Sequence, residues 1–228
     1  ATNYDGCFYE GAAIYRLVWL QQFNSLHVAD GDFFVHSKIE GKKATVTLET
    51  TVTNKNFSPS DCTVATYITT REGKIIGKSS EQQLYLTTNQ QGTVKQKITL
   101  YNPLLLDIDY PYLYLAVTVV KQKGKIVDQH KIKFGIRSVA FEGKKGFFLN
   151  GKPLKIKGTN NHQDHAGVGS ALPDDLQYYR IKLLKEMGSN AYRASHHAPT
   201  RELLEACDSL GMLVVDEQRL LNSSAEYL

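Results

Sequence analysis

The chain has 228 residues, of which 42% are hydrophobic and 22% charged, with a formal net charge of +4. This composition is typical of a globular protein, and a chain of this length can bury roughly 70% of the surface that it exposes when unfolded. The longest apolar stretch, residues 12–20, is short and interrupted by Arg16, which excludes a membrane-spanning helix.

The N-terminal residues ATNYDGC include neither an initiator Met nor the basic and apolar segments of a signal peptide. We therefore expect a mature or trimmed chain, and the sequence leaves its localisation open.

Basic residues gather around one predicted hairpin turn, KGK. They are Lys121, Lys123, Lys125, Lys131 and Lys133. No aromatic residues alternate with them to stack on bases, so we interpret them as a solvated hairpin face and expect no nucleic-acid partner.

The three cysteines, Cys7, Cys62 and Cys207, are far apart and lack Cys-x-x-Cys spacing. This pattern favours buried free thiols over a disulfide framework or a structural zinc site.

From about residue 27 to 141, apolar and polar side chains alternate with the period of two that half-buried strands show. We expect seven strands, at residues 33–39, 43–54, 62–70, 74–86, 92–100, 112–122 and 125–141. In the second strand Ala44, Val46 and Leu48 face one way. Seven short antiparallel strands predict an immunoglobulin-like sandwich over residues 23–140, although the Cys, Trp, Cys hallmark of antibody domains is absent.

After Phe141 the pattern changes to strand, helix, strand, helix, strand. The strands are predicted at residues 153–158, 190–195 and 212–217, and the helices at 173–188 and 200–211. The apolar face of the first helix is predicted to contain Leu176, Tyr179, Leu183, Leu184 and Met187. That of the second contains Leu203, Cys207 and Leu210, with Thr200 as N-cap and Gly211 at the end.

Right-handed crossovers would make these three strands parallel, with their carboxyl ends on one edge, where α/β folds bind ligands. Three polar clusters fall there: NNHQDH, RASHH and DEQR. An eight-stranded barrel needs about 250 residues, so residues 141–228 predict only its first part. The predicted fold class is multi-domain β plus α/β: an immunoglobulin-like β-sandwich followed by the first three strands of an incomplete (β/α)8 TIM barrel. The exposed third strand predicts association through its edge.

The segment GTNNHQDHAGVG, residues 158–169, allows three interpretations. A metal site would draw on His162, Asp164, His165, His196, His197 and Asp216. An ordinary turn would use Asn160 and the histidines to satisfy backbone groups. A sugar-binding loop would use the same Asn, His and Asp side chains, with Arg193, as donors and acceptors for a polyhydroxylated ligand. We favour the sugar-binding loop.

Arg193 is expected either over the barrel mouth or in an ion pair with Asp216 or Glu217. One of His196 and His197 should face the site, and the sequence does not show which. Asp216 and Glu217 are adjacent on a strand and so point to opposite faces, whereas a retaining mechanism needs two carboxylates about 5 Å apart. We therefore predict structural roles for both.

The motifs together resemble glycoside hydrolase family 2, the β-galactosidase and β-glucuronidase family, over nearly the whole chain. GCFYEGAAIYRLVWL resembles the last strand of the family's jelly-roll domain, assigned here to residues 1–22. DYPYLYLAVTVV and KFGIRSVAF resemble late strands of its immunoglobulin-like domain. GFFLNGKPLKIKGTNNHQDH and NAYRASHHAPTRELLEACDSLGMLVVDE resemble the first three barrel strands.

The resemblance implies a retaining exo-glycosidase that hydrolyses terminal β-linked sugars, with β-galactosides preferred. Its two catalytic glutamates would follow the fourth and seventh barrel strands, beyond residue 228, so the chain alone is expected to be inactive. His162 and His196 would contact the sugar, and Arg193 would orient the nucleophile. Asn160 and Asp164 would belong to the same polar rim.

The sequence departs from the family pattern at Ala13, in GAAIYR, and at His197 and Ala198. Because of these departures, the sequence does not define which leaving group the enzyme accepts. Two other functions stay open: a metal-dependent hydrolase using His162 and His165, and a non-catalytic glycan-binding or interaction module. We expect a carbohydrate partner, no association with a membrane and no cofactor within this chain. The longer enzyme could bind a divalent cation.

Overall fold

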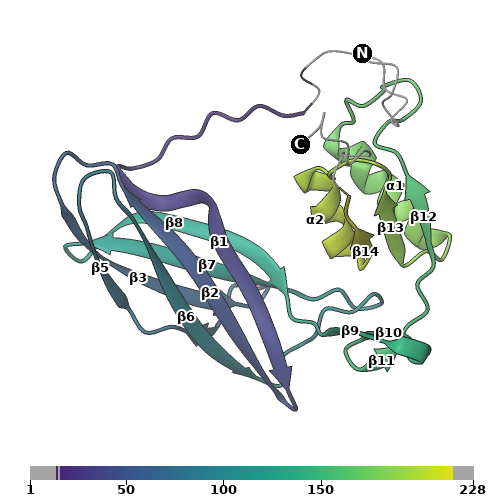
Figure 1. The fold of residues 1–228 in the computed structure, drawn as a ribbon, viewed down its shortest axis with the longest axis horizontal. Helices are drawn as coiled ribbons and strands as arrows, with labels where there is room; N and C mark the ends of the chain where they lie inside the picture. Colours follow the sequence, from purple (N-terminus) through teal and green to yellow (C-terminus); the bar gives the residue numbers. More distant parts are fainter. Residues whose placement is uncertain (1–13, 15, 218–228) are drawn as a thin grey trace.

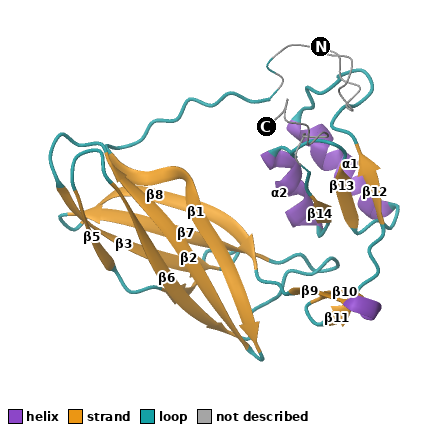
Figure 2. Cartoon of the chain, viewed as in Figure 1, coloured by secondary structure: helices purple, strands orange, loops and turns teal. Residues whose placement is uncertain are grey.

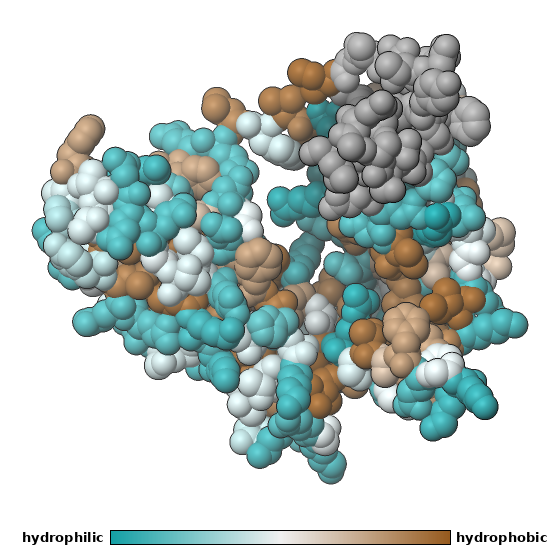
Figure 3. All heavy atoms as spheres, in the orientation of Figure 1, coloured by the Kyte–Doolittle hydropathy of each residue, from teal (hydrophilic) through white to brown (hydrophobic). Residues whose placement is uncertain are grey.

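The computed structural model describes residue 14 and residues 16–217. They form a β-sandwich and a small α/β unit, linked by a short three-stranded sheet (Figure 1). An extended segment precedes the sandwich, and its apolar side chains Leu17, Val18 and Leu20 are exposed. Figure 3 shows hydrophobic atoms on the surface along this segment. The predicted jelly-roll strand at residues 1–22 lies mostly outside the described residues, and residues 16–22 form no strand.

Two antiparallel sheets build the sandwich. One contains β1 (Leu26–Glu40), β2 (Lys43–Asn54) and β6 (Gln91–Tyr101), in the order β1-β2-β6. The other is built from β3 (Ser60–Thr69), β4 (Ile75–Lys78), β5 (Gln82–Leu86), β7 (Leu113–Gln122) and β8 (Lys125–Gly135). Its order is β4-β3-β7-β8, and β5 also pairs with β3. The predicted immunoglobulin-like sandwich is confirmed.

The inward side chains of the two sheets share one core. Ala44, Val46 and Leu48 of β2 are fully buried, as the alternation predicts. A polar group also lies there: Thr66 Oγ1 donates to Gln96 Oε1 at 2.9 Å, and Gln96 Nε2 donates to the carbonyls of Val64 and Ser80 at 3.0 Å. These hydrogen bonds offset the cost of burying the Gln96 amide.

Three of the predicted strands differ by more than two residues from the observed ones. Residues 74–86 form two strands instead of one, because the Ser79 hydroxyl accepts a hydrogen bond from Thr66 N (2.9 Å) and ends the ladder. The last predicted strand stops at Gly135, where Leu106 packs closely and Leu106 N donates to Ile136 O at 2.8 Å. The first begins earlier than expected, at Leu26, and contains a register shift.

The linking sheet contains β9 (Val139–Glu142), β10 (Gly146–Leu149) and β11 (Lys152–Pro153), with a 3-10 turn at Gly143–Lys145. The α/β unit follows as β12 (Gly158–Asn161), α1 (Asp174–Glu186), β13 (Ala191–Ala194), α2 (Arg201–Leu210) and β14 (Leu213–Val215). Its three strands are parallel in the order β12-β13-β14, as predicted for the start of a TIM barrel (Figure 2). In the described part of the chain, neither helix is long and apolar enough to span a membrane.

The helices pack on the face of β13 that carries Tyr192 and Ala194. Thr200 caps α2 by accepting a hydrogen bond from Leu203 N, and Gly211 ends it with φ of 70°, as predicted. Leu203 and Cys207 of α2 are buried there, so the predicted face of α2 is correct.

The predicted position of the first barrel strand is wrong. The first barrel strand is β12 instead of residues 153–158. Pro153 belongs to the linking hairpin, where it pairs with Phe148, and the pairing of the barrel strands begins only at Gly158. Gly158 permits this close pairing, since a Cβ there would lie 2.5 Å from Ala191 O.

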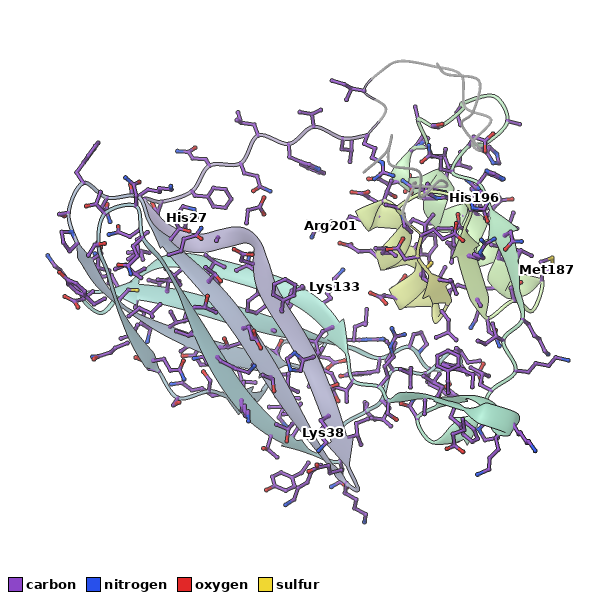
Figure 4. All side chains as sticks on the ribbon, in the orientation of Figure 1. His27, Lys38, Lys133, Met187, His196 and Arg201 are labelled. Carbon is purple, nitrogen blue, oxygen red and sulfur yellow. The ribbon has the colours of Figure 1, made fainter. Side chains whose placement is uncertain are left out.

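The buried face of α1 is only partly the predicted one. Leu184 packs against the core and Leu176 is half-buried, as predicted. Tyr179, Leu183 and Met187 are exposed, and Met187 projects from the outer side of the unit (Figure 4). The fully packed positions are Gln177 and Ile181. Both sides of α1 carry apolar residues, so periodicity alone did not identify the side that meets β13 and α2.

The sandwich and the α/β unit meet through the segment between β6 and β7. Lys185 Nζ donates to Ile108 O at 2.5 Å and to Gly211 O at 3.0 Å, which ties this segment to both helices. Asn150 of the linking hairpin donates to Leu106 O at 3.0 Å. Gly211 lies directly against Ile108.

Candidate functional site

Strand register brings three polar side chains to one face at the carboxyl edge of the α/β sheet. Asn160 of β12 pairs with Arg193 of β13, and Arg193 pairs with Val215 of β14. Because side chains alternate along a strand, Glu217, two residues after Val215, shares the face of Asn160 and Arg193. The helices cover the opposite face.

The Arg193 guanidinium crosses this edge and contacts its neighbours on both sides. Nη1 donates to Asn160 Oδ1 at 3.1 Å and to Ser195 Oγ at 3.4 Å, and Nη2 forms an ion pair with Glu217 Oε1. Of the two predicted ion-pair partners, Glu217 is the one that binds Arg193. The three strands are thus joined at the site by one side chain.

Glu217 also binds His196. An ionised carboxylate only accepts hydrogen bonds, so His196 Nδ1 donates to Glu217 Oε2, at 2.7 Å. This hydrogen bond, with the nearby Arg193 charge, lowers the pKa of Glu217, which is therefore ionised at neutral pH. The carboxylate therefore holds the Arg193 guanidinium and the His196 ring at once.

His162 and His196 form the aromatic part of the site. Their ring centroids are 5.9 Å apart and the rings are nearly perpendicular, at 83°. His196 lies near the end of the α/β unit from which the loops project (Figure 4). The site therefore unites Asn160, His162, Arg193, His196 and Glu217.

Asp164, the remaining predicted site residue, lies outside this network. It is exposed on the loop after β12, where His165 and Gly169 close a turn through two backbone hydrogen bonds of 2.9 Å. The sequence predicted a structural role for Glu217, with either it or Asp216 as the ion-pair partner of Arg193. The two-residue spacing of Glu217 from Val215, which pairs with Arg193, is the signal that selects Glu217 over Asp216.

The structure distinguishes the two adjacent histidines. His196 reaches the site, whereas His197 is only 3% exposed and lines a cavity of about 480 Å³ on the helix side. Burial lowers the pKa of His197, so its ring is neutral near pH 7. Within the described residues, Nδ1 of His197 has no hydrogen-bond partner.

Residue 14 and residues 16–217 contain no group of three or more His, Cys, Asp or Glu side chains arranged to hold a metal ion. Cys62 and Cys207 are buried free thiols, and burial raises the pKa of Cys207 to about 12. Cys7 lies outside the described residues.

Comparisons with known proteins match both parts of the chain. Residues 26–137 match Glycosyl hydrolases family 2, and residues 139–225 match the TIM barrel domain of Glycosyl hydrolases family 2. A β-galactosidase of Bacteroides ovatus is 36% identical over 92% of the chain and 25% of its own length. A β-glucuronidase of Formosa agariphila is 29% identical over 89% of the chain and 22% of its own length.

A solved structure of a family 2 glycosyl hydrolase from Bacteroides cellulosilyticus superposes with a TM-score of 0.82 and 35% identity. The superposition covers 86% of this chain and 27% of that one. The chain thus spans about a quarter of the length of the relatives that it matches.

Proposed function

The chain belongs to glycoside hydrolase family 2, and we propose that it is the central part of a retaining exo-glycosidase acting on terminal β-linked sugars. The acid/base and nucleophile glutamates of that enzyme lie outside these 228 residues, and β-galactosides are its preferred substrates. The residues of this chain bind the sugar and hold no cofactor.

The observation that carries this proposal is the joined set of side chains at the carboxyl edge of β12, β13 and β14. Asn160, His162 and His196 offer donors and acceptors of the kind that sugar hydroxyls require. Arg193 is fixed by Asn160 and Glu217, so its remaining guanidinium hydrogens have a defined direction. We assign these hydrogens to the nucleophilic carboxylate.

Asp216 and Glu217 do not qualify as the catalytic carboxylates. The two are adjacent on an extended segment and point to opposite faces, whereas retaining hydrolysis needs two carboxylates about 5 Å apart across one bond. Glu217 is moreover engaged by Arg193 and His196. Its lowered pKa makes it unsuited to protonate a leaving group.

The relatives support a galactoside over a glucuronide. The β-galactosidase of Bacteroides ovatus is 36% identical to the chain, whereas the β-glucuronidase of Formosa agariphila is 29% identical.

The test compares the 228-residue chain with the longer protein that contains it, using nitrophenyl β-galactoside and nitrophenyl β-glucuronide. We expect no hydrolysis by the chain alone, and hydrolysis by the longer protein with the higher kcat/KM on the galactoside. Turnover by the purified chain would refute the placement of the catalytic carboxylates. A higher kcat/KM on the glucuronide would refute the sugar preference.

Arg193→Met in the longer protein should lower kcat/KM at least about tenfold, a loss of about 1.4 kcal/mol of transition-state stabilisation. The control Arg201→Met removes an exposed arginine that pairs with Glu205 on α2, and should leave kcat/KM unchanged. Saturable sugar binding without any hydrolysis would support a glycan-binding module instead. Activity lost on chelation and restored by zinc would support a metal-dependent hydrolase.

A further inference from the structure

The inner face of α1 carries two polar side chains where it packs on the sheet. Gln177 is 5% exposed and Arg180 is half-buried, and both precede the fully buried Ile181. Three residues apart, Gln177 and Arg180 lie on the same side of the helix. Polar groups are costly in such a position unless they are hydrogen-bonded, so their partners indicate what they do.

Arg180 binds the loop that carries His162. Its Nη2 donates to the backbone carbonyl of His162 at 2.8 Å, and Nη1 donates more weakly to that of Gln163 at 3.5 Å. The planar guanidinium can serve both carbonyls because its donors form a fixed fork. The backbone that presents the His162 ring is therefore held from α1.

Gln177 binds the loop that carries His196. Thr200 Oγ1 donates to Gln177 Oε1 while accepting a hydrogen bond from Leu203 N, so Gln177 fixes the residue that caps α2. The segment between β13 and Thr200 contains His196, and Ser195 N donates to Asn161 O at 3.0 Å. This segment is thereby held at both ends.

We propose that Arg180 and Gln177 are positioning residues that set the separation of the His162 and His196 rings in the sugar site. The proposal rests on the function proposed above. Neither side chain is placed to touch the sugar, because α1 packs on the face of the sheet opposite Arg193 and Glu217. One helix thus holds both loops from behind.

If Gln177 and Arg180 only stabilised the fold, replacing them would lower the stability of the whole chain. The variants are chosen to distinguish that effect from a local change in the loops that carry His162 and His196. Gln177→Leu replaces a buried polar group by an apolar one of similar size and removes the acceptor of the Thr200 hydroxyl. Thr200 is only partly buried and lines the cavity, so water can replace that acceptor, and we expect the Tm to stay within a few degrees of wild type. Arg180→Met removes both bonds to the loop, and Arg180→Lys keeps the charge and one donor. Arg201→Met is the matched control. Arg201 lines the same cavity as Gln177, Arg180 and His197, but its guanidinium pairs with Glu205.

The first measurement is amide hydrogen exchange on the full 228-residue chain. In Arg180→Met the amides of His165 and Gly169 should exchange at least about tenfold faster, with sandwich amides unchanged, since the turn they close loses its anchor. Arg180→Lys should recover part of this protection, and Arg201→Met should match wild type. Wild-type exchange at His165 and Gly169 in Arg180→Met would overturn the role of Arg180.

The second measurement is the NMR spectrum of the imidazole rings. Gln177→Leu should shift the ring signals of His196, and unchanged signals in a folded variant would overturn the role of Gln177. If Arg180→Met fails to fold, Arg180→Lys decides the case: its His165 and Gly169 amides must exchange faster than wild type, or the proposal is wrong.

The third measurement is the affinity of the longer protein for methyl β-galactoside, which should weaken about tenfold in Arg180→Met and Gln177→Leu, but not in Arg201→Met. Wild-type affinity in both variants would overturn the link between loop position and sugar binding. Absence of galactoside binding by the wild-type longer protein, together with the expected exchange and NMR changes, would refute the proposed function while leaving the positioning roles supported.

Discussion

Replacing Gly211 by alanine should weaken the packing of the α/β unit against the segment between β6 and β7. Gly211 ends α2 with φ of 70°, and a Cβ there would lie 2.3 Å from Ile108 O. A left-handed conformation costs an L-residue about 1–2 kcal/mol, and relieving an overpacked contact costs about 1–3 kcal/mol more. The free energy of unfolding should therefore fall by about 2–5 kcal/mol in Gly211→Ala.

Gly188→Ala supplies the matched control. Gly188 also follows a helix, with φ of 95°, but a Cβ there would meet nothing within 4 Å. This variant should lose only the conformational part, about 1–2 kcal/mol. The difference between the two variants measures the contact with Ile108.

Urea unfolding followed by circular dichroism gives both free energies, and hydrogen exchange locates the damage. In Gly211→Ala, but not in Gly188→Ala, the amide of Leu106 should exchange faster, because it bonds Ile136 in the segment pressed by the new methyl group. Equal costs for the two variants, with unchanged exchange at Leu106, would refute the reasoning.

Three further outcomes follow from buried or paired polar groups. Gln96→Leu should lower the free energy of unfolding by about 1–3 kcal/mol, because the buried Val64 carbonyl loses its Gln96 donor and the Thr66 hydroxyl keeps only Thr118 as a partner, whereas the exposed Gln83→Leu should change it by less than about 0.5 kcal/mol. The lowered pKa of Glu217 means that its carboxylate stabilises the fold above its ordinary pKa, about 4.3, and that this contribution disappears as pH falls through the lowered value. The stability difference between wild type and Glu217→Gln should therefore persist at pH 5.5 and vanish in strong acid; a constant difference would contradict this. Burial lowers the pKa of His197 in the folded protein. As pH falls below about 6.5, the imidazole of the unfolded chain is protonated before that of the folded protein, so wild type loses stability. His197→Leu should show a smaller loss between pH 8 and pH 5.5 in the same denaturation assay.

Local chemistry explains the features that sequence reasoning predicted correctly. The alternation along β2 follows from the two-residue repeat of a strand, and the limits of α2 follow from a threonine hydroxyl at its start and a glycine at its end. These signals lie within a few residues of the structures they specify. These features can therefore be predicted without knowing how the rest of the chain folds.

The face of α1 shows where such reasoning fails. Tyr179, Leu183 and Met187 form a regular apolar stripe that is exposed, whereas the helix buries Gln177 and Ile181, with Leu184 of the predicted face packed beside them. Thr200 and the carbonyls of the β12 loop supply partners for the polar side, and those partners lie far away along the chain. Periodicity records that a helix has two faces, but not what each face meets.

The candidate site divides in the same way. Its place at the carboxyl edge of three parallel strands, with Asn160, Arg193 and a histidine, follows from chain order, because parallel strands present their ends together. Three features depend on register and on side-chain direction: the pairing of Glu217 with Arg193, the position of His196 in the site, and the burial of His197 on the helix side. A register shift of one residue would turn Glu217 away from Arg193, and contacts between distant segments set that register.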